Sequence, residues 1–132
     1  MGQQQLLLIV LGVIIVGIAV VVGINIFSAS SSNANRDAVV SDLTNLGAMA
    51  QQYYRKPTAM GGGGNSFVGF TTAKIPASLL TNANGTYTVK TAGTSTTIVF
   101  SGTGKEKGYN GTGAISVDMS VWADSMKASM TN

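Results

Sequence analysis

The side chains that could perform acid–base or metal chemistry are few and scattered along the chain. There is no histidine and no cysteine, and only five residues are acidic: Asp37, Asp42, Glu106, Asp118 and Asp124. General acid–base catalysis usually uses His, Cys, Lys, Tyr or paired carboxylates, and structural zinc sites use Cys and His. Since the chain has no His, no Cys, no recognisable Ser-Lys pairing and no cluster of acids, we expect that the protein is not an enzyme and that it holds no metal and no cofactor.

Two other motifs carry a possible chemistry. The run Gly61–Gly64 lacks the residue spacing of dinucleotide-binding and P-loop motifs, so a flexible loop is the simpler interpretation. Asn84-Gly85-Thr86 and Asn110-Gly111-Thr112 match the N-glycosylation sequon, which makes Asn84 and Asn110 possible glycosylation sites. Both also match ordinary Asn-Gly turns, which is the interpretation we favour.

Charge is sparse in this chain. Lys, Arg, Asp and Glu make up 10% of the 132 residues, against about a quarter in an average globular domain, and the net charge is +3. The basic residues form no patch interleaved with aromatic side chains, so we expect no nucleic-acid partner. A surface with little charge and many small polar residues suits a packed assembly better than a freely soluble domain.

The strongest signal is an uninterrupted apolar segment close to the first residue. Residues 6–24 read LLLIVLGVIIVGIAVVVGI and carry no charged or strongly polar side chain. As a helix, such a segment spans roughly 28 Å, close to the hydrocarbon core of a bilayer. A cleavable signal peptide would have a basic start and an apolar stretch of about 7–15 residues. Residues 1–5 contain no Lys or Arg, so we expect a retained helix, covered by lipid or by copies of itself.

The segment that follows is predicted to continue as an amphipathic helix. Apolar residues recur at spacings of four and three and would pack on a small sheet: Val39, Leu43, Leu46, Ala50 and Tyr53. The polar stretch 28–35 could be a kink, an unwound stretch or part of one long helix, and Asn35 could cap a renewed helix. We therefore expect an N-terminal helix over residues 1–54, with an apolar part (1–27) and an amphipathic part (28–54).

Residues 55–132 are predicted to form a small head. Alternating or β-branched runs at 86–91, 96–101 and 114–123 read as strands, with a glycine-rich loop over 102–113. Short connections imply antiparallel pairing, and one apolar sheet face fits one amphipathic helix. The expected fold is α+β: a long N-terminal helix packed on an antiparallel sheet of three or four strands.

This layout resembles that of type IV pilins and pseudopilins. At the level of motifs the resemblance is confined to about the first 25 residues, where Met1 and a short polar stretch precede LLLIVLG. It implies a prepilin peptidase, a methylated first residue, an inner-membrane pilus assembly machinery, membrane insertion before assembly, and a cell-surface homopolymeric filament. The residues then expected to form the filament core are Met1, Gln5, Leu6, Leu8, Ile9, Leu11, Val13, Val16, Val20 and Ile24.

The chain departs from the family pattern at three points. Gln5 stands where the family usually has a glutamate that pairs with a neighbouring amine; Gln5 can accept a hydrogen bond but brings no charge. The helix-breaking proline and the C-terminal disulfide are also missing. Some pseudopilins bind calcium near the C-terminus, but a calcium site needs six or more oxygen ligands, and we interpret Asp118 and Asp124 as solvated. We also interpret the helix residues Asp37 and Asp42 as solvated.

Two alternatives to a filament subunit remain at the level of the sequence. One is a pseudopilin of a secretion system, and the other is a bitopic membrane protein whose head is a small binding domain. Basic residues near a membrane span favour the cytoplasmic side. No basic residue precedes the apolar segment, whereas three follow it: Arg36, Arg55 and Lys56. This charge bias opposes an outward-facing head unless a dedicated export machinery overrides it. The sequence does not separate adhesion, motility, DNA uptake and secretion.

Overall fold

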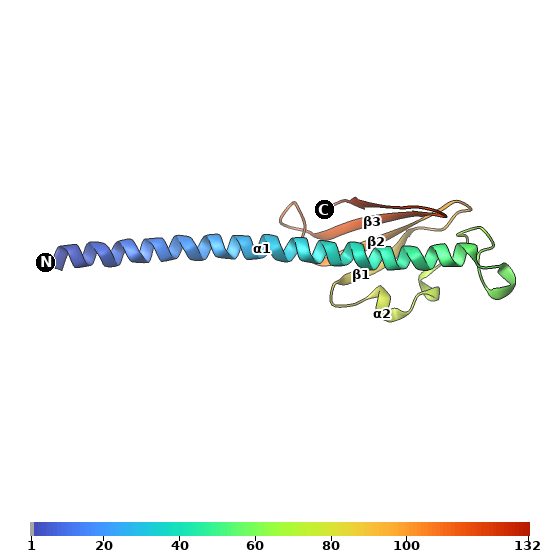
Figure 1. The fold of residues 1–132 in the computed structure, drawn as a ribbon, viewed down its shortest axis with the longest axis horizontal. Helices are drawn as coiled ribbons and strands as arrows, with labels where there is room; N and C mark the ends of the chain where they lie inside the picture. The colour runs from blue at the N-terminus through green and yellow to red at the C-terminus, as the bar shows by residue number, and fades with distance from the viewer. Residues whose placement is uncertain (1) are drawn as a thin grey trace. The chain divides into compact units, whose positions relative to one another are not determined.

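The structure, a computed structural model, describes residues 2–132. The chain divides into two compact units: the first ends at Ser31 and the second begins at Ser32. Helix α1 (Gly2–Arg55) supplies the described part of the first unit and the start of the second. The second unit, here called the head, adds the 3-10 turns η1 (Thr58–Met60) and η2 (Thr72–Lys74) and the short helix α2 (Ala77–Leu80). It continues with the strands β1 (Gly85–Thr91), β2 (Thr97–Lys107), β3 (Ala114–Trp122) and β4 (Met126–Met130) (Figure 1).

The four strands form one antiparallel sheet in the order β1-β2-β3-β4, so each strand pairs with the strand before it in the chain. The alternation of β3 places Ile115, Val117, Met119 and Val121 on the face that meets α1, where all four are buried. The opposite face carries Ser, Thr and charged residues from the same strands. The predicted class, a long apolar N-terminal helix followed by a small antiparallel sheet, is confirmed.

One core holds the head together. It joins the inner face of the sheet to one stripe of α1 and to aromatic residues of the connecting loops. Tyr54 and Phe67 have ring centroids 4.8 Å apart, and Phe70 meets Phe100 edge-on at 6.0 Å. Each such pair adds about 0.5–1.5 kcal/mol beyond its buried area, so the loop between α1 and β1 is held by aromatic packing.

The glycine run after α1 closes the end of the helix. The last carbonyl groups of a helix have no partner within it, and here backbone amides of Gly63, Gly64 and Asn65 donate to the carbonyls of Tyr53, Lys56 and Tyr54 at 2.7–3.0 Å. A Cβ at Gly62 or Gly63 would collide with backbone atoms of Lys56 or Ser66. The sequence predicted only a flexible loop, whereas these residues wrap tightly around the helix end.

Of the three alternatives for residues 28–35, the structure shows part of one long helix, so Asn35 lies inside α1 and caps no renewed helix. Two other sequence-based assignments need correction. Residues 102–107, predicted as part of a loop, extend β2. The three predicted strands are joined by β4, which the sequence did not specify.

Two glycines of β2 allow α1 to approach the sheet closely. A Cβ at Gly102 would lie 2.9 Å from Cγ1 of Val39 and 2.9 Å from the ring of Tyr87, and a Cβ at Gly104 would collide with the side chain of Asn35. Gly102→Val should therefore lower the free energy of unfolding of the head by about 1–3 kcal/mol through overpacking. Urea unfolding followed by circular dichroism would measure this.

The neighbouring exposed residue of the same strand provides the control for that substitution. Thr103→Val adds the same side chain on the opposite face of β2, where its effect should stay within about 0.5 kcal/mol. Equal urea midpoints for the Gly102 and Thr103 variants would contradict the close approach.

Candidate functional site: the exposed apolar half of α1

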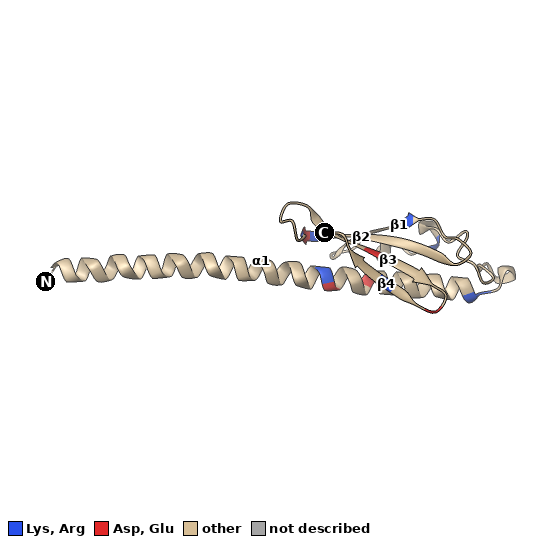
Figure 2. Ribbon diagram, turned by 90° about the horizontal axis from the view of Figure 1, so that it is seen from above, with Lys and Arg blue, Asp and Glu red and all other residues tan. Residues whose placement is uncertain are grey.

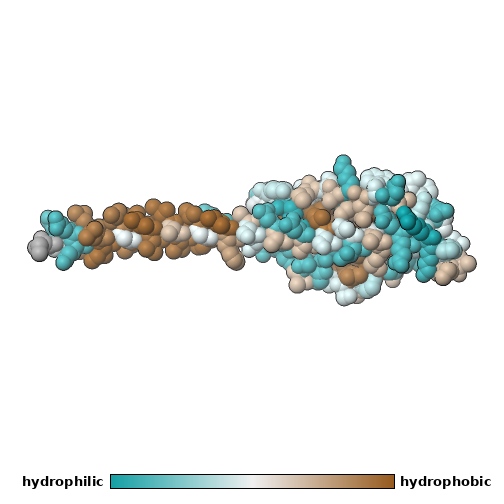
Figure 3. Space-filling model, viewed as in Figure 1, coloured by the Kyte–Doolittle hydropathy of each residue, from teal (hydrophilic) through white to brown (hydrophobic). Residues whose placement is uncertain are grey.

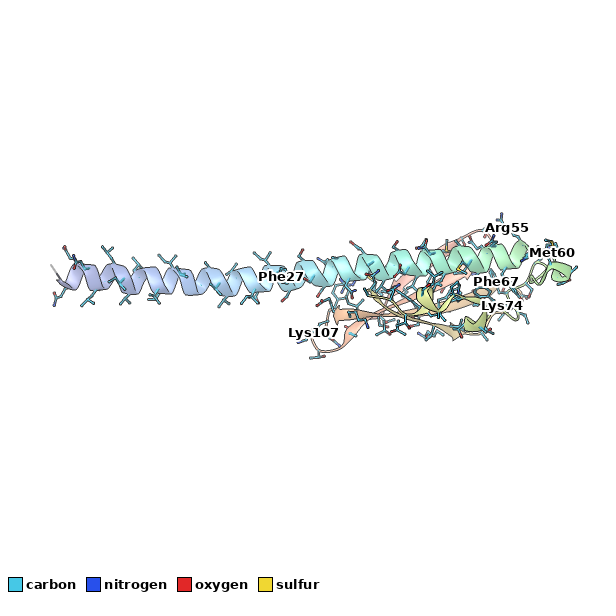
Figure 4. All side chains as sticks on the ribbon, turned by 90° about the horizontal axis from the view of Figure 1, so that it is seen from below. Phe27, Arg55, Met60, Phe67, Lys74 and Lys107 are labelled. Carbon is cyan, nitrogen blue, oxygen red and sulfur yellow. The ribbon has the colours of Figure 1, made fainter. Side chains whose placement is uncertain are left out.

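The first unit is a single apolar helix whose large side chains are all exposed. From Leu6 to Phe27 the exposed fraction of the large hydrophobic side chains runs from 48% at Val22 to 73% at Phe27. Figure 3 shows this surface as nearly continuous brown, and Figure 4 shows its side chains projecting on all sides of the helix. A helix that is apolar all round requires cover all round, from lipid or from protein.

The expected filament-core residues all lie in this unit. Leu6, Leu8, Ile9, Leu11, Val13, Val16, Val20 and Ile24 are each more than half exposed, so none packs inside the chain. Gln5 is exposed in the first turns of α1, where no acidic residue lies. Met1 lies outside the described residues. No Lys, Arg, Asp or Glu colours this part of the ribbon in Figure 2.

By length and composition, α1 is the one helix of residues 2–132 that could cross a membrane. Core helices of soluble proteins and signal sequences can pass the same test, but a core helix would be buried within its own chain. The apolar window of α1 is not buried at all, so its cover must come from outside the chain.

The predicted head-packing stripe lies on the side of α1 that faces the sheet. Val39, Leu43 and Ala50 are 0% exposed and Leu46 is 1% exposed. Tyr53, the fifth member, is half-buried; its ring packs 5.2 Å from that of Phe70, and its hydroxyl donates to the carbonyl oxygen of Val68 at 2.8 Å.

A polar cluster that the sequence did not predict joins α1 to the start of β1. Asp42 Oδ2 accepts hydrogen bonds from the hydroxyl of Tyr87 at 2.5 Å, from Nδ2 of Asn82 at 3.1 Å and from Nδ2 of Asn84 at 3.2 Å. Burial raises the pKa of the Asp42 carboxyl, but the hydrogen bonds from Tyr87, Asn84 and Asn82 together outweigh burial, so the pKa lies below its ordinary value. Asp42 was interpreted as solvated, and that interpretation is wrong.

The pKa of the Tyr87 hydroxyl, which donates to Asp42, shifts in the opposite direction. Burial raises the pKa of Tyr87 above its ordinary value, and the hydrogen bond to Asp42 and the negative charge of Asp42 raise the pKa further. The neutral phenol donating to an ionised carboxylate is thus the stable arrangement across the neutral pH range. This cluster positions the sheet on the helix.

Stability should depend on this cluster in acid. Because the folded pKa of Asp42 is lowered, its stabilising contribution is present above the unfolded pKa of about 3.9 and is lost as the pH falls through the folded value. Asp42→Asn should cost about 1–3 kcal/mol at pH 7, and the difference from wild type should shrink steadily below pH 4. Urea unfolding between pH 7 and pH 2 would measure both effects.

Asp37→Asn is the matched control, because Asp37 is an exposed acid on the same helix. Its effect should stay within about 0.5 kcal/mol at every pH. If the two variants behaved alike, the hydrogen-bonded role of Asp42 would be refuted.

Asn35 is a second residue of α1 whose side chain links the helix to the sheet by hydrogen bonds. Its Nδ2 donates to the carbonyl oxygen of Asn84 at 2.8 Å, and its Oδ1 accepts from the backbone amides of Lys105 at 2.9 Å and Glu106 at 3.1 Å. One side chain of α1 therefore satisfies a backbone carbonyl just before β1 and two backbone amides of β2, where the pairing of β2 with β3 is irregular.

The two possible glycosylation sites differ sharply in environment. Asn84 is half-buried, and its Nδ2, the atom that would carry a glycan, donates to Asp42, so glycosylation there would break the polar cluster. Asn110 is exposed in the turn between β2 and β3, where its Oδ1 accepts from the backbone amides of Thr112 and Gly113 at 3.0 Å. Asn110 is therefore the Asn of an Asn-Gly turn.

The remaining charged residues do not converge on a centre. Asp118, also interpreted as solvated, is only 9% exposed and forms an ion pair with Lys90 on the outer sheet face, which corrects that interpretation. No group of three or more His, Cys, Asp or Glu side chains that could hold a metal occurs within residues 2–132. A shallow groove of about 360 Å³ lies beside the end of α1, lined by Met49, Gln52, Tyr53, Lys56, Gly61, Phe70 and Lys74.

Comparison with known proteins adds no relative. No protein-family model, no curated protein and no solved structure matches the chain. The pilin-like architecture, an apolar N-terminal helix that continues into a helix packed on a small antiparallel sheet, therefore stands on the structure itself.

Proposed function

We propose that the protein is the structural subunit of a pilus-like helical filament that polymerises through the apolar half of α1. The observation that carries this proposal is the exposure of the whole segment: sixteen Leu, Ile and Val side chains between Leu6 and Ile26 are about half exposed or more. At about 1.5–3 kcal/mol for each buried side chain, covering them is favourable by the order of 25–50 kcal/mol before entropy is counted.

Two kinds of cover fit this surface at successive stages. Lipid covers the segment while the chain is anchored in a membrane, since the segment is long enough to span the hydrocarbon core. Copies of the same segment cover it after assembly, with the heads on the outside of the filament. In this proposal the mature protein is an extracellular filament at the cell surface, and its partners are copies of itself.

The head supports assembly better than ligand binding. Its surface has little charge, the groove beside the end of α1 is shallow, and its acidic residues form no metal-binding group among the described residues. By resemblance, a prepilin peptidase would process the chain and an inner-membrane machinery would assemble it. Methylation of the first residue and a role in cell adhesion belong to the same proposal.

A simple bitopic anchor is the second candidate, because the apolar length that fits a filament core also fits one membrane span. The two differ in what surrounds the segment in the mature state. In a filament the segment contacts other copies, whereas in a bitopic protein it contacts lipid.

Cross-linking of single-cysteine variants separates these candidates, and the chain has no cysteine of its own to confuse the result. The full chain carrying Val16→Cys, isolated without detergent from cells that express the assembly machinery, is treated with a short bismaleimide and viewed by negative-stain electron microscopy. Because each chain carries one thiol, we expect a covalent dimer, together with filaments. Monomers that remain in the membrane fraction and give no covalent dimer would refute the filament.

A further inference from the structure

The turn between β2 and β3 lies against the first residues of α1 that belong to the head. Asn35 accepts hydrogen bonds from the amides of Lys105 and Glu106, and the guanidinium of Arg36 lies 3.9 Å from the centre of the Tyr109 ring. This end of the head, residues 105–113 with the start of the α1 stripe, is here called the near end. Figure 4 shows Lys107 at this end of the sheet and Arg55 and Met60 at the opposite end of the head.

The near end is tied to the apolar segment by a short stretch of chain. Asn33, whose side chain accepts a hydrogen bond from Arg36, comes six residues after Phe27. Six residues span about 9 Å as a helix and at most about 20 Å when fully extended, whatever the angle between the two units. The headgroup layer on each side of a bilayer is about 5–8 Å thick. When residues 6–27 lie in a membrane, the near end is therefore held at the surface of that membrane.

The side chains of the near end suit such a surface. Tyr109 is 72% exposed, its ring covers Arg36, and its hydroxyl contacts the sulfur of Met130, which is itself 47% exposed. Tyrosine is enriched at the membrane interface, where its ring lies among the headgroups and its hydroxyl meets water. Lys105 and Lys107 are exposed beside it and have long apolar stems that can reach phosphate groups.

We propose that the near end of the head docks on the phospholipid headgroup layer of the bilayer that holds its own apolar segment. Tyr109 and Met130 enter the interface, and Lys105 and Lys107 pair with lipid phosphates. This rests on the membrane-anchored state in the proposed function. Asp37 and Glu106 are exposed at the same end, so the contact depends on the ring and on local lysine–phosphate pairs and not on a large net charge.

Docking gives the unassembled subunit a defined orientation. Arg36 is 5% exposed and its Nε has no hydrogen-bond partner among the described residues, so the covering Tyr109 ring stabilises the cation. The ring is thus held by a residue of the head's part of α1, and the lipid contact would fix the head relative to the bilayer before copies meet.

Fluorescence quenching of two single-tryptophan chains tests the proposal. The full chain is placed in phosphatidylcholine nanodiscs with or without a nitroxide on the headgroup. Wild type reports from Trp122, its one tryptophan, at the opposite end of the sheet, where Gln51 donates to the Trp122 carbonyl oxygen. The Tyr109→Trp, Trp122→Phe chain reports from the near end and keeps an aromatic ring over Arg36. We expect strong quenching and a blue-shifted emission only for the tryptophan at position 109.

Charge reversal separates docking from simple proximity. In the Tyr109→Trp, Trp122→Phe chain, Lys105→Glu with Lys107→Glu should remove most of the quenching, whereas Lys56→Glu with Lys74→Glu at the opposite end should leave it unchanged. Quenching at position 109 no stronger than at Trp122, or unaltered by reversal at the near end, would overturn the proposal. Filament formation without quenching would refute docking alone, and failure of the chain to enter nanodiscs would refute membrane anchoring, on which both proposals rest.

Discussion

Leu43→Asp is expected to leave the head unfolded while the apolar half of α1 stays helical. Leu43 is 0% exposed and is among the largest fully buried side chains of the head. Removing a buried leucine side chain to alanine already costs about 2–5 kcal/mol, and an unpaired carboxylate in the same place adds a desolvation cost of several kcal/mol. A domain of this size has only about 5–15 kcal/mol of stability to lose.

The expected result is loss of near-ultraviolet circular dichroism and of protease resistance for residues 32–132 in the full chain. Thr44→Asp is the matched control, because it introduces the same carboxylate at the next, exposed residue of α1. That variant should unfold within about 0.5 kcal/mol of wild type. A Leu43→Asp head that melts as wild type does would show that this stripe is not the core of the head.

The stripe could be predicted because its cause is local. Val39, Leu43, Leu46 and Ala50 follow the 3.6-residue period of a helix, and the alternation at 114–123 follows the period of a strand. Each pattern specifies its own buried face without knowledge of its partner. The structure brings the two faces together in one core.

The missed strand segments lack such a pattern. Residues 102–107 read GTGKEK and residues 126–130 read MKASM, and neither run is rich in β-branched or aromatic residues. They become strands because a neighbouring strand offers a ladder: Met119 and Val121 of β3 pair with Ala128 and Met126 of β4. Tertiary pairing overrides weak propensity here.

The polar contacts of the head could not be predicted for a related reason. The partners of Asp42 lie 40 to 45 residues away, and those of Asn35 lie 49 to 71 residues away. A single sequence shows that an Asp or Asn lies on a helix, but it does not show which distant backbone or side chain will meet it. The apolar segment is the opposite case, since its composition alone demands external cover.

Val13→Asp is expected to abolish filaments while leaving the head folded and the chain in the membrane. Val13 lies within the apolar segment and is 67% exposed on α1, so its side chain faces whatever covers the segment. One aspartate at the centre of a spanning helix costs about 2.5–3.5 kcal/mol on insertion scales. The remaining apolar side chains offset that cost, so the single chain should still enter the membrane.

Assembly responds differently to the same carboxylate, because every copy brings one into a helical core. Each charge there would be buried without a partner, beside the equivalent charges of neighbouring copies, and no basic residue lies within residues 1–35 to compensate it. Each chain therefore loses more by entering the filament, where its carboxylate lies beside like charges, than by staying in the membrane as a single chain.

Three measurements on one preparation decide the outcome: membrane fractionation, limited proteolysis of the head, and filament yield by negative-stain microscopy. Val13→Leu is the control for a change of shape and should assemble as wild type does. Val13→Asn separates polarity from charge and should reduce the yield less than Val13→Asp, since a neutral amide can hydrogen-bond between copies. Filaments from Val13→Asp at the wild-type yield would refute burial of this segment among copies and would leave lipid as its mature cover.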